Sequence, residues 1–205
     1  MKTEILSTAN PRAVSRALKI LRGGGLVAFP TDTVYGLGAL ALDAAAVESI
    51  YAAKGRPAEK AIPILIGDPD DLEKVCSSVP PMAQKLAARF WPGPLTLVVP
   101  KHPSLPEAVS ATLTVGVRVP DHPVARALLR ATGPMAVTSA NLSGQTNPVS
   151  AGEVMAQLNG RIPLVLDGGV TPGGIPSTVV NCVGAKPLIL REGPLTLEQI
   201  MTILG

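Results

Sequence analysis

Polar side chains that could bind a small anionic molecule gather where the apolar segment Leu26–Phe29 ends. This segment reads as a buried strand, and Pro30 stops it because proline has no N–H to donate to a neighbouring strand. The hydroxyls of Thr31 and Thr33 and the carboxylate of Asp32 follow directly. In α/β proteins, small molecules bind in the crevice beyond such strand ends. We therefore expect a ligand site here.

Three cations stand at positions where they could serve that site. Lys54 and Arg56 flank a glycine at the end of the next predicted helix, where cations can simply complement the helix dipole. Their place just after the polar strand end favours a ligand role. Arg118 lies inside the apolar segment 115–119, and an unpaired buried charge is costly. A structural ion pair and a ligand carboxylate are equally open as its partner.

Further strand ends carry hydroxyl, amide or cationic groups, at Thr138 to Asn141, at Ser177-Thr178 and at Arg191. The whole set suits phosphoryl or nucleotidyl transfer, where catalysis is mostly positioning and neutralisation of phosphate charge. Neither a Ser-His-Asp arrangement nor a carboxylate pair for glycoside chemistry is apparent. The sequence also lacks GxxxxGK[ST], so ATP would be held without a P-loop, with Mg²⁺ bound mainly by the substrate phosphates.

Alternating apolar segments and helical patterns predict the elements that position these groups. We expect one α/β domain over residues 1–205, with a twisted, mixed parallel and antiparallel sheet flanked by helices and a ligand cavity on a concave face. Helices are expected to start at Asn10-Pro11, Asp43, Asp68-Pro69, Pro80-Pro81, Asp121, Ser150 and Thr196, the last two with capping boxes. Strands are expected at 26–29, 62–66, 95–99, 115–119, 135–137, 164–166, 177–180 and 188–190.

Composition limits the class of protein. The 205 residues are 46% hydrophobic, enough for one well-packed domain, and the net charge of +3 mildly favours anionic ligands. Two distant cysteines and two histidines do not suggest a zinc site. The N-terminus does not resemble a signal peptide and no apolar stretch is long enough to span a membrane, so we expect a cytoplasmic protein.

The segments PTDTVYGLG, KGRP, TVGVR, TSANLSG, PSTVV and LREG resemble, in collinear order, the YrdC/Sua5 family of L-threonylcarbamoyladenylate synthases. The combination is specific and extends from about Leu26 to Gly193. It implies that the chain, as a short single-domain form, makes threonylcarbamoyl-AMP and pyrophosphate from L-threonine, bicarbonate or CO₂, and ATP. The implied partner is a transferase complex that uses this product to modify adenosine 37 of tRNA.

The resemblance also implies a role for each matching residue. It assigns catalysis to Lys54 and Arg56, with no covalent enzyme intermediate. The implied ATP ligands, with Mg²⁺ on the phosphates, are Lys54, Arg56, Thr114, Ser139, Asn141, Asn147 and Arg191. The implied L-threonine ligands are Thr31, Thr33, Arg118, Val137 through its backbone, and Ser177.

The chain departs from the family pattern at two positions, and other functions stay open. Longer members have a histidine where this chain has Leu65, and a serine where it has Asn147, whose amide could still bond a ribose or phosphate. One alternative is a non-catalytic module that binds tRNA or double-stranded RNA, for which few aromatic rings are needed; weak RNA binding by the enzyme is also open. Another is a relative that adenylates a different carbamate. The Gly/Pro-rich segment 170–176 is either a lid or a fixed surface loop.

Overall fold

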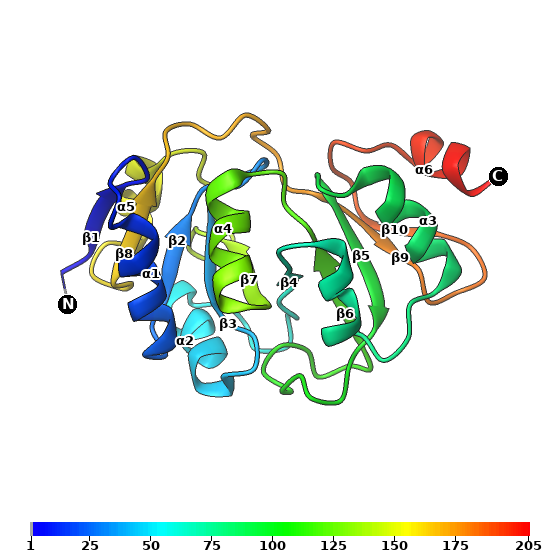
Figure 1. Cartoon of the computed structure of the whole chain (residues 1–205), viewed down its shortest axis with the longest axis horizontal. Coiled ribbons are helices and arrows are strands. Elements are labelled where there is room, and N and C mark those ends of the chain that lie inside the picture. Colours follow the sequence, from blue (N-terminus) through cyan, green and yellow to red (C-terminus); the bar gives the residue numbers. More distant parts are fainter. Residues whose placement is uncertain (1) are drawn as a thin grey trace.

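The computed structural model describes residues 2–205, which form one mixed ten-stranded β-sheet flanked by helices (Figure 1). The strand order is β1-β8-β2-β3-β7-β4-β6-β5-β9-β10. The strands are β1 (Glu4–Ser7), β2 (Val27–Phe29), β3 (Gly36–Leu40), β4 (Ile64–Leu65), β5 (Leu95–Pro100), β6 (Thr114–Arg118), β7 (Met135–Ser139), β8 (Leu164–Asp167), β9 (Thr178–Asn181) and β10 (Leu188–Arg191). The helices are α1 (Ala13–Arg22), α2 (Ala44–Lys54), the 3₁₀ helix η1 (Pro69–Lys74), α3 (Pro81–Phe90), α4 (Pro123–Thr132), α5 (Ala151–Leu158) and α6 (Leu197–Leu204).

Successive side chains along the strands enter two different hydrophobic cores, one on each face of the sheet. On β2, Val27 and Phe29 pack with α1 and α4, whereas Ala28 belongs to the core that contains α2 and α5. The strands β7 and β8 divide their side chains in the same way. Because side chains alternate across a strand, a fully apolar strand fills both faces at once. This explains why β2 and β7 read as continuous apolar runs in the sequence.

The mixed sheet confirms the predicted fold class, with two strands that the sequence analysis missed. The pairs β1/β8, β2/β8, β4/β6 and β5/β9 are parallel, and β2/β3, β3/β7, β4/β7, β5/β6 and β9/β10 are antiparallel. The missed strands are β1, whose short alternating pattern is weak, and β3, which contains two glycines. The strand predicted at 62–66 shrinks to Ile64–Leu65.

Two predicted helix caps are confirmed. The Asp43 carboxylate accepts a hydrogen bond from the Ala46 backbone N–H at 3.0 Å and so caps α2. Thr196 and Gln199 form a reciprocal capping box at the start of α6. Both side chains satisfy backbone donors that have no partner inside the helix.

Two other predicted helix starts, at Asn10-Pro11 and Asp121, and the capping box predicted at Ser150 need correction. Helix α1 begins at Ala13, because Asn10 accepts from the Arg12 backbone N–H at 2.9 Å and closes a separate turn before it. Helix α4 begins after His122, and Asp121 instead donates its backbone N–H to the Asp32 carboxylate at 3.1 Å. Ser150 caps α5, but the Glu153 carboxylate accepts from Val149, one residue too early for a capping box. Local hydrogen bonds thus occupy the side chains of Asn10 and Glu153, whereas Asp121 is held through its backbone by the distant Asp32.

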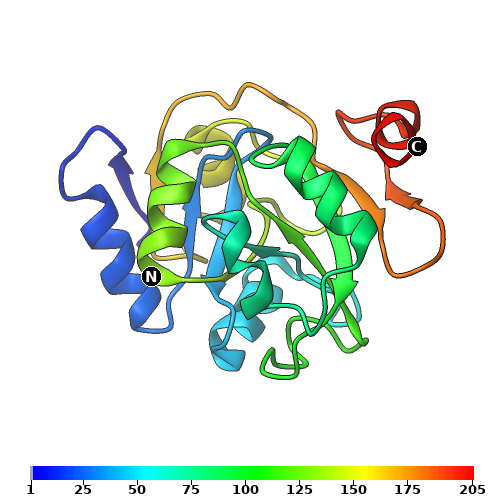
Figure 2. The same cartoon turned by 45° about the vertical axis from the view of Figure 1, so that its right-hand side comes forward.

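A ten-residue connection, residues 168–177, passes from β8 to β9 and is called the strap below. It crosses between the two halves of the molecule along the upper edge of Figure 1, and Figure 2 shows the same crossing from a second side. The Tyr35 hydroxyl donates to the Gly169 carbonyl at 2.7 Å, and the Gly174 N–H donates to the Thr33 carbonyl at 2.9 Å. The Thr171 N–H donates to the Val149 carbonyl at 2.8 Å. These contacts favour a fixed loop over a lid.

Gly193 lies against the end of the strap and allows the C-terminal segment to approach it closely. A Cβ atom at this position would lie 2.3 Å from the Thr178 nitrogen and 2.6 Å from the Pro176 oxygen, which are both backbone atoms. We expect Gly193→Ala to lower the free energy of unfolding by about 1–3 kcal/mol through overpacking. Urea denaturation would measure this loss.

A matched control is Gly152→Ala in α5, where the nearest heavy atom to a new Cβ is 3.9 Å away. Alanine is the better helix former, so this variant should gain up to about 1 kcal/mol. Equal stability of the two variants would contradict the close approach at Gly193.

Candidate active site

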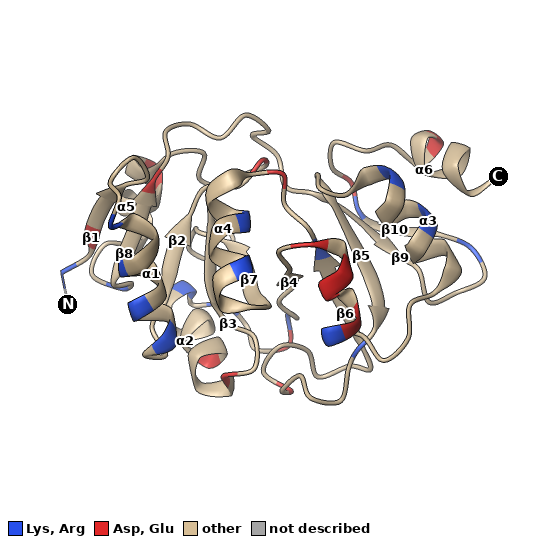
Figure 3. Cartoon of the chain, in the orientation of Figure 1, with Lys and Arg blue, Asp and Glu red and all other residues tan. Residues whose placement is uncertain are grey.

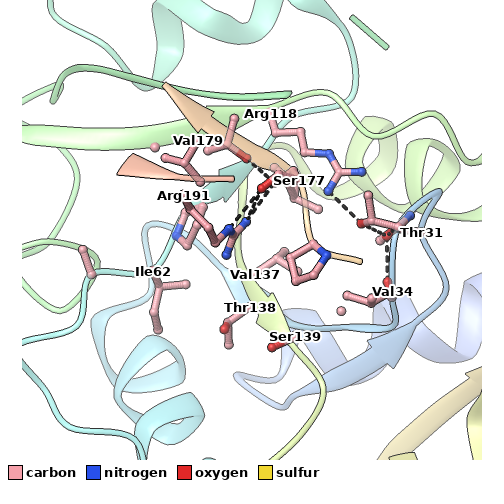
Figure 4. Close-up of a pocket in the computed structure, with 18 of the residues that line it drawn as sticks. Thr31, Val34, Ile62, Arg118, Val137, Thr138, Ser139, Ser177, Val179 and Arg191 are labelled. Carbon is pink, nitrogen blue, oxygen red and sulfur yellow. Dashed lines mark hydrogen bonds between the residues drawn. The ribbon is translucent and has the colours of Figure 1, made fainter. Parts of the chain in front are cut away.

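A cavity of about 380 Å³ gathers most of the residues that the sequence analysis placed in a site (Figure 4). It is bounded by the β2–β3 connection, the loop after α2, the end of the strap, and side chains from the strands between β3 and β10. Its size falls in the range of small-molecule sites. The predicted residues that line it are Thr31, Thr33, Arg56, Arg118, Val137, Ser139, Ser177 and Arg191.

The threonine pair at the end of β2 forms a local hydrogen-bonded turn. The Thr31 hydroxyl donates to the Val34 carbonyl at 2.7 Å and lies 3.0 Å from the Thr33 hydroxyl. The Thr33 backbone N–H donates back to the Thr31 hydroxyl at 3.2 Å. Such turns arise because a short hydroxyl side chain competes for nearby backbone groups. Thr31 therefore shapes the turn, and Thr33 presents its hydroxyl to the cavity.

Arg118 is 5% exposed and is tied to three different segments. It forms an ion pair with Asp32, donates through Nη1 to the Thr33 hydroxyl at 2.9 Å, and donates through Nε to the Gly93 carbonyl at 2.9 Å. The structural ion pair is therefore present. Arg118 also lines the cavity, and because its terminal nitrogens carry further protons, its contact with a ligand carboxylate stays a prediction.

Arg191, at the end of β10, holds the strap end from the other side of the cavity. Its Nε and Nη2 donate to the Ser177 carbonyl at 3.0 and 2.8 Å, and Nη2 also lies 3.0 Å from the Ser177 hydroxyl. The Ser177 hydroxyl is 2.7 Å from the buried hydroxyl of Thr96 on β5. The sequence analysis missed Thr96, although it is the one hydroxyl residue in the apolar strand LTLVV, which was the available signal.

Arg56 enters the cavity from the loop that follows α2. Its Nε and Nη2 donate to the carbonyls of Lys60 and Ala61 at 3.2 and 2.9 Å. The guanidinium thus stiffens its own loop, and Nη1 makes no hydrogen bond to the described residues 2–205. Gly55 has a left-handed φ of +58°, which ends α2 and turns the chain from Lys54 towards the cavity at Arg56.

The cavity carries an excess of positive charge. Three arginines line it, and within residues 2–205 the lining includes neither Asp nor Glu. Burial lowers the pKa of Arg191, and the positive charges of Arg118 and Arg56 lower it further. Arg191 is thus close enough to both other arginines to be repelled by their charges. Asp32, which is not part of the cavity lining, neutralises the charge of Arg118. The remaining charge favours a ligand with at least two negative charges.

Four predicted residues do not line the cavity. Thr114 is half-buried at the start of β6 beside Thr112, with 3.2 Å between their hydroxyls, and Asn147 is half-buried in the loop before α5. The Asn141 amide donates to the carbonyls of Leu142 and Gln145 at 2.8 Å and closes its own turn. Lys54 is 2% exposed, and its ammonium donates to the carbonyls of Ser139, at 2.5 Å, and Asn141. The side chains of Lys54, Thr114 and Asn141 are therefore already hydrogen-bonded to neighbouring residues.

Burial gives Lys54 a distinctive titration. Desolvation, followed by the charge of Arg56, lowers the pKa of Lys54 from 10.5 to about 7. Between these values the unfolded chain binds more protons at this residue than the folded chain, so the contribution to stability rises with pH. We expect the free energy of unfolding of the wild type, relative to Lys54→Met, to increase from pH 7 to 10. Denaturant titrations at several pH values measure this difference, and a flat or falling difference would contradict the shift.

The rest of the wall is apolar and was not anticipated residue by residue. It includes Leu65, which lies beside Arg118 in the β4/β6 register. Further apolar lining comes from Val34, Ile62, Pro63, Val98, Val179 and Leu190. An apolar wall opposite arginines and hydroxyls can hold a ring or an aliphatic group while the polar side fixes its orientation.

The donor set fits a metal ion that arrives with its substrate. Across residues 2–205 there is no group of three or more His, Cys, Asp or Glu that could hold a metal. The hydroxyls of Thr138 and Ser139 line the cavity and could contact such an ion or its water shell. Mg²⁺ keeps several waters and is often held mainly by substrate phosphates, which requires few protein carboxylates.

Comparison with known proteins gives a consistent family. The family model Sua5_yciO_yrdC, described as "Telomere recombination", matches residues 19–193. The chain is 45% identical over 206 residues to "Threonylcarbamoyl-AMP synthase" of Bacillus subtilis, covering 99% of this chain and 59% of the relative. It is 43% identical over 208 residues to "Putative threonylcarbamoyl-AMP synthase" of Mycobacterium tuberculosis H37Rv, covering 99% and 96%.

Solved structures agree in fold. "Crystal structure of P. abyssi Sua5 complexed with L-threonine" superposes with a TM-score of 0.95 at 43% identity, covering 99% of this chain and 61% of that chain. "Crystal structure of E. coli YciO" gives a TM-score of 0.86 at 28% identity, covering 97% and 99%. The chain thus spans less than two thirds of the B. subtilis and P. abyssi proteins and almost all of the shorter relatives.

Proposed function

The chain belongs to the Sua5/YrdC/YciO family, and on that premise we propose that it is an L-threonylcarbamoyladenylate synthase, a nucleotidyltransferase. Its substrates would be L-threonine, bicarbonate or CO₂, and ATP with Mg²⁺. Its products would be threonylcarbamoyl-AMP and pyrophosphate. The observation that carries the proposal is the convergence of three arginines with free hydroxyls in one cavity whose lining, within residues 2–205, has no carboxylate.

The chemistry has two steps. The threonine amine attacks the carbon of CO₂ and loses a proton, which forms a carbamate; starting from bicarbonate, water leaves. A carbamate oxygen then attacks the α-phosphorus of ATP, and the bond to the bridging oxygen of pyrophosphate breaks. Positioned cations stabilise the charge that builds on the phosphate oxygens in the second step. Neither step needs a covalent bond to the protein.

The cavity offers distinct groups for the two substrates. Arg118, Thr33 and Ser177 would bind the amino acid, with the Arg118 guanidinium facing its carboxylate. The backbone of Val137 and the turn at Thr31 would complete that end. Arg56, Arg191 and Ser139 would face the triphosphate. Mg²⁺ bound to the phosphates would shield their charge, with the hydroxyls of Thr138 and Ser139 nearby.

Pyrophosphate release and mass spectrometry of the product test this assignment. Purified protein with L-threonine, bicarbonate, ATP and Mg²⁺ should release pyrophosphate and form threonylcarbamoyl-AMP, and omission of threonine should stop both. Faster release with another amino acid would identify a synthase for a different carbamate. Salt-sensitive tRNA binding without ATP turnover would identify an RNA-binding module and overturn the proposal.

The distribution of charge gives that RNA-binding alternative little support. Basic and acidic residues are interspersed over the face seen in Figure 3. Arg126 and Arg130 of α4 are both paired with Asp68, and Arg16 of α1 is paired with Glu4. Such pairing reduces the net positive charge that a phosphate backbone would meet.

The enzyme would work with other proteins of tRNA modification. Threonylcarbamoyl-AMP is a mixed anhydride, so a transferase must take it over to place the threonylcarbamoyl group on adenosine 37 of tRNA. We propose a cytoplasmic protein for that reason. None of the helices in residues 2–205 has the length and apolar character required to cross a bilayer.

A further inference from the structure

Ser177 ends the strap, and its main chain is held on both sides. Its carbonyl accepts from Nε and Nη2 of Arg191 at 3.0 and 2.8 Å, as Figure 4 shows. The N–H of the next residue, Thr178, donates to the Pro94 carbonyl at 3.0 Å. The Ser177 hydroxyl can therefore change its place only by rotation of the side chain. A neighbour that bonds this hydroxyl determines where it points.

Thr96 on β5 is that neighbour. It lines the cavity and is buried, and its hydroxyl lies 2.7 Å from the Ser177 hydroxyl. The pairing of β5 with β9 brings the two together, since Leu95 lies opposite Thr178. The Thr96 methyl group lies over Gly116 of β6, where a Cβ atom would be only 3.0 Å from it. Because threonine is branched at Cβ, a methyl group in this place also fixes the hydroxyl.

The hydrogen bonds of the two hydroxyls leave one proton without an acceptor. Nη2 of Arg191 can only donate, so the Ser177 hydroxyl accepts from it at 3.0 Å. The Thr96 and Ser177 hydroxyls share one bond, and neither donates to any other acceptor within residues 2–205. If Thr96 is the donor, Arg191 and Thr96 fill both lone pairs of the Ser177 oxygen. Ser177 then offers the cavity only its own proton.

We propose that Thr96 is a positioning residue, which donates to Ser177 and so makes the Ser177 hydroxyl a pure donor towards the carboxylate of the amino acid. The inference rests on the proposed function, which supplies L-threonine as the ligand. Arg118 lies close by, because Leu97 of β5 pairs with Val117 of β6. The residues next to this pair, Thr96 and Arg118, both line the cavity. A guanidinium and a hydroxyl proton at one end of the cavity suit a single carboxylate.

Calorimetric titration of Thr96→Val with L-threonine tests the inference. Valine keeps the branched side chain and loses the hydroxyl. We expect the Kd for L-threonine to rise by about tenfold, the effect of one hydrogen bond to a charged group. Thr96→Ser keeps the donor and should restore the Kd to within about threefold of the wild type. Equal Kd values for the wild type and Thr96→Val would overturn the inference.

Thr3→Val is the matched control for the loss of a buried hydroxyl. Thr3 precedes β1, at the other end of the sheet from β5 and β9. Its hydroxyl donates to the Ile162 carbonyl at 2.7 Å and accepts from the Gly160 N–H at 2.8 Å. This variant should unfold at a lower urea concentration and bind L-threonine as the wild type does. A weaker affinity for L-threonine in Thr3→Val would mean that general loosening explains the effect at Thr96.

Steady-state kinetics separate a positioning role from a structural one. At saturating ATP, Thr96→Val should raise the KM for L-threonine and leave kcat within about twofold, because the carboxylate is bound alike in the ground state and the transition state. Thr96→Ser should restore the KM. A lower kcat at unchanged KM, which loss of folded protein would produce, would contradict the positioning role.

Neutron diffraction from crystals of the free protein soaked in D₂O tests the direction of the bond without any ligand. We expect the Thr96 deuterium between the two hydroxyl oxygens and the Ser177 deuterium pointing into the cavity. The opposite arrangement would overturn the inference even if Thr96→Val does not fold. If the wild type neither binds L-threonine nor releases pyrophosphate, the proposed function fails, and the deuterium positions still show which hydroxyl donates.

Discussion

Replacement of Arg118 by alanine is expected to lower the free energy of unfolding by about 3–5 kcal/mol, because it leaves the buried Asp32 carboxylate without its counter-charge. The side chains of this pair are only 7% and 12% exposed, so water compensates little. The variant also loses the bonds to Thr33 and Gly93, which join three segments of the cavity wall. Chemical denaturation measures the stability loss.

The same variant should bind ATP almost normally once it is folded, and it should lose most of its affinity for L-threonine. Calorimetric titration with each substrate separates the two effects. A folded Arg118→Ala protein that loses both affinities equally would contradict the assignment of Arg118 to the amino-acid end.

A double substitution separates stability from function. Arg118→Met with Asp32→Asn removes both charges, and the asparagine oxygen can still accept from the Asp121 N–H, which now donates to Asp32 at 3.1 Å. We expect this protein to recover most of the lost stability, since replacing a whole buried pair costs far less than breaking it. Threonine affinity should stay low. Recovery of both properties would show that Arg118 acts only through folding.

Replacement of Arg191 by alanine should affect ATP binding more than stability, which is the reverse of what we expect for Arg118→Ala. Arg191 has no carboxylate partner within residues 2–205, and the charges of Arg118 and Arg56 already oppose its own. Its loss removes the bonds to Ser177 but leaves no buried carboxylate unpaired, so the free energy of unfolding should fall by about 1–2 kcal/mol, less than in Arg118→Ala. Hydrogen bonds to charged groups contribute about 1.5–3 kcal/mol each, so the Kd for ATP should rise by about 10- to 100-fold.

Arg191→Lys is the control for the shape of the guanidinium group. Lysine keeps the charge but cannot hold the Ser177 carbonyl with two parallel donors as Arg191 does. We expect an intermediate affinity for ATP and a lower affinity for threonine, because Ser177 loses its support. An Arg191→Ala protein as unstable as Arg118→Ala, with normal ATP affinity, would contradict a ligand role for Arg191.

The sequence determined the fold class and most of the cavity wall. Short apolar runs such as 26–29 and 135–137, next to glycine or proline, indicate strands buried on both faces. The polar residues that follow them are then expected at the edge of the sheet, where ligands bind. Local chemistry also determined the caps at Asp43 and Thr196, because both act on backbone groups within three residues. Arg118 was recognised as a buried charge that needs a partner.

Only the tertiary structure decided the partners. The spacing of Lys54 and Arg56 is the same whether both face the ligand or only one does, and a single left-handed glycine separates them in space. Asp32 is 86 residues from Arg118 and 89 from Asp121 in the sequence, and it meets both because the β2–β3 connection packs against the segment before α4. Thr96 reaches Ser177 only because β5 and β9 pair in parallel. Residue types thus fix which bonds are possible, whereas the crossing of distant segments fixes which of them form, because burial leaves each donor only the acceptors within its reach.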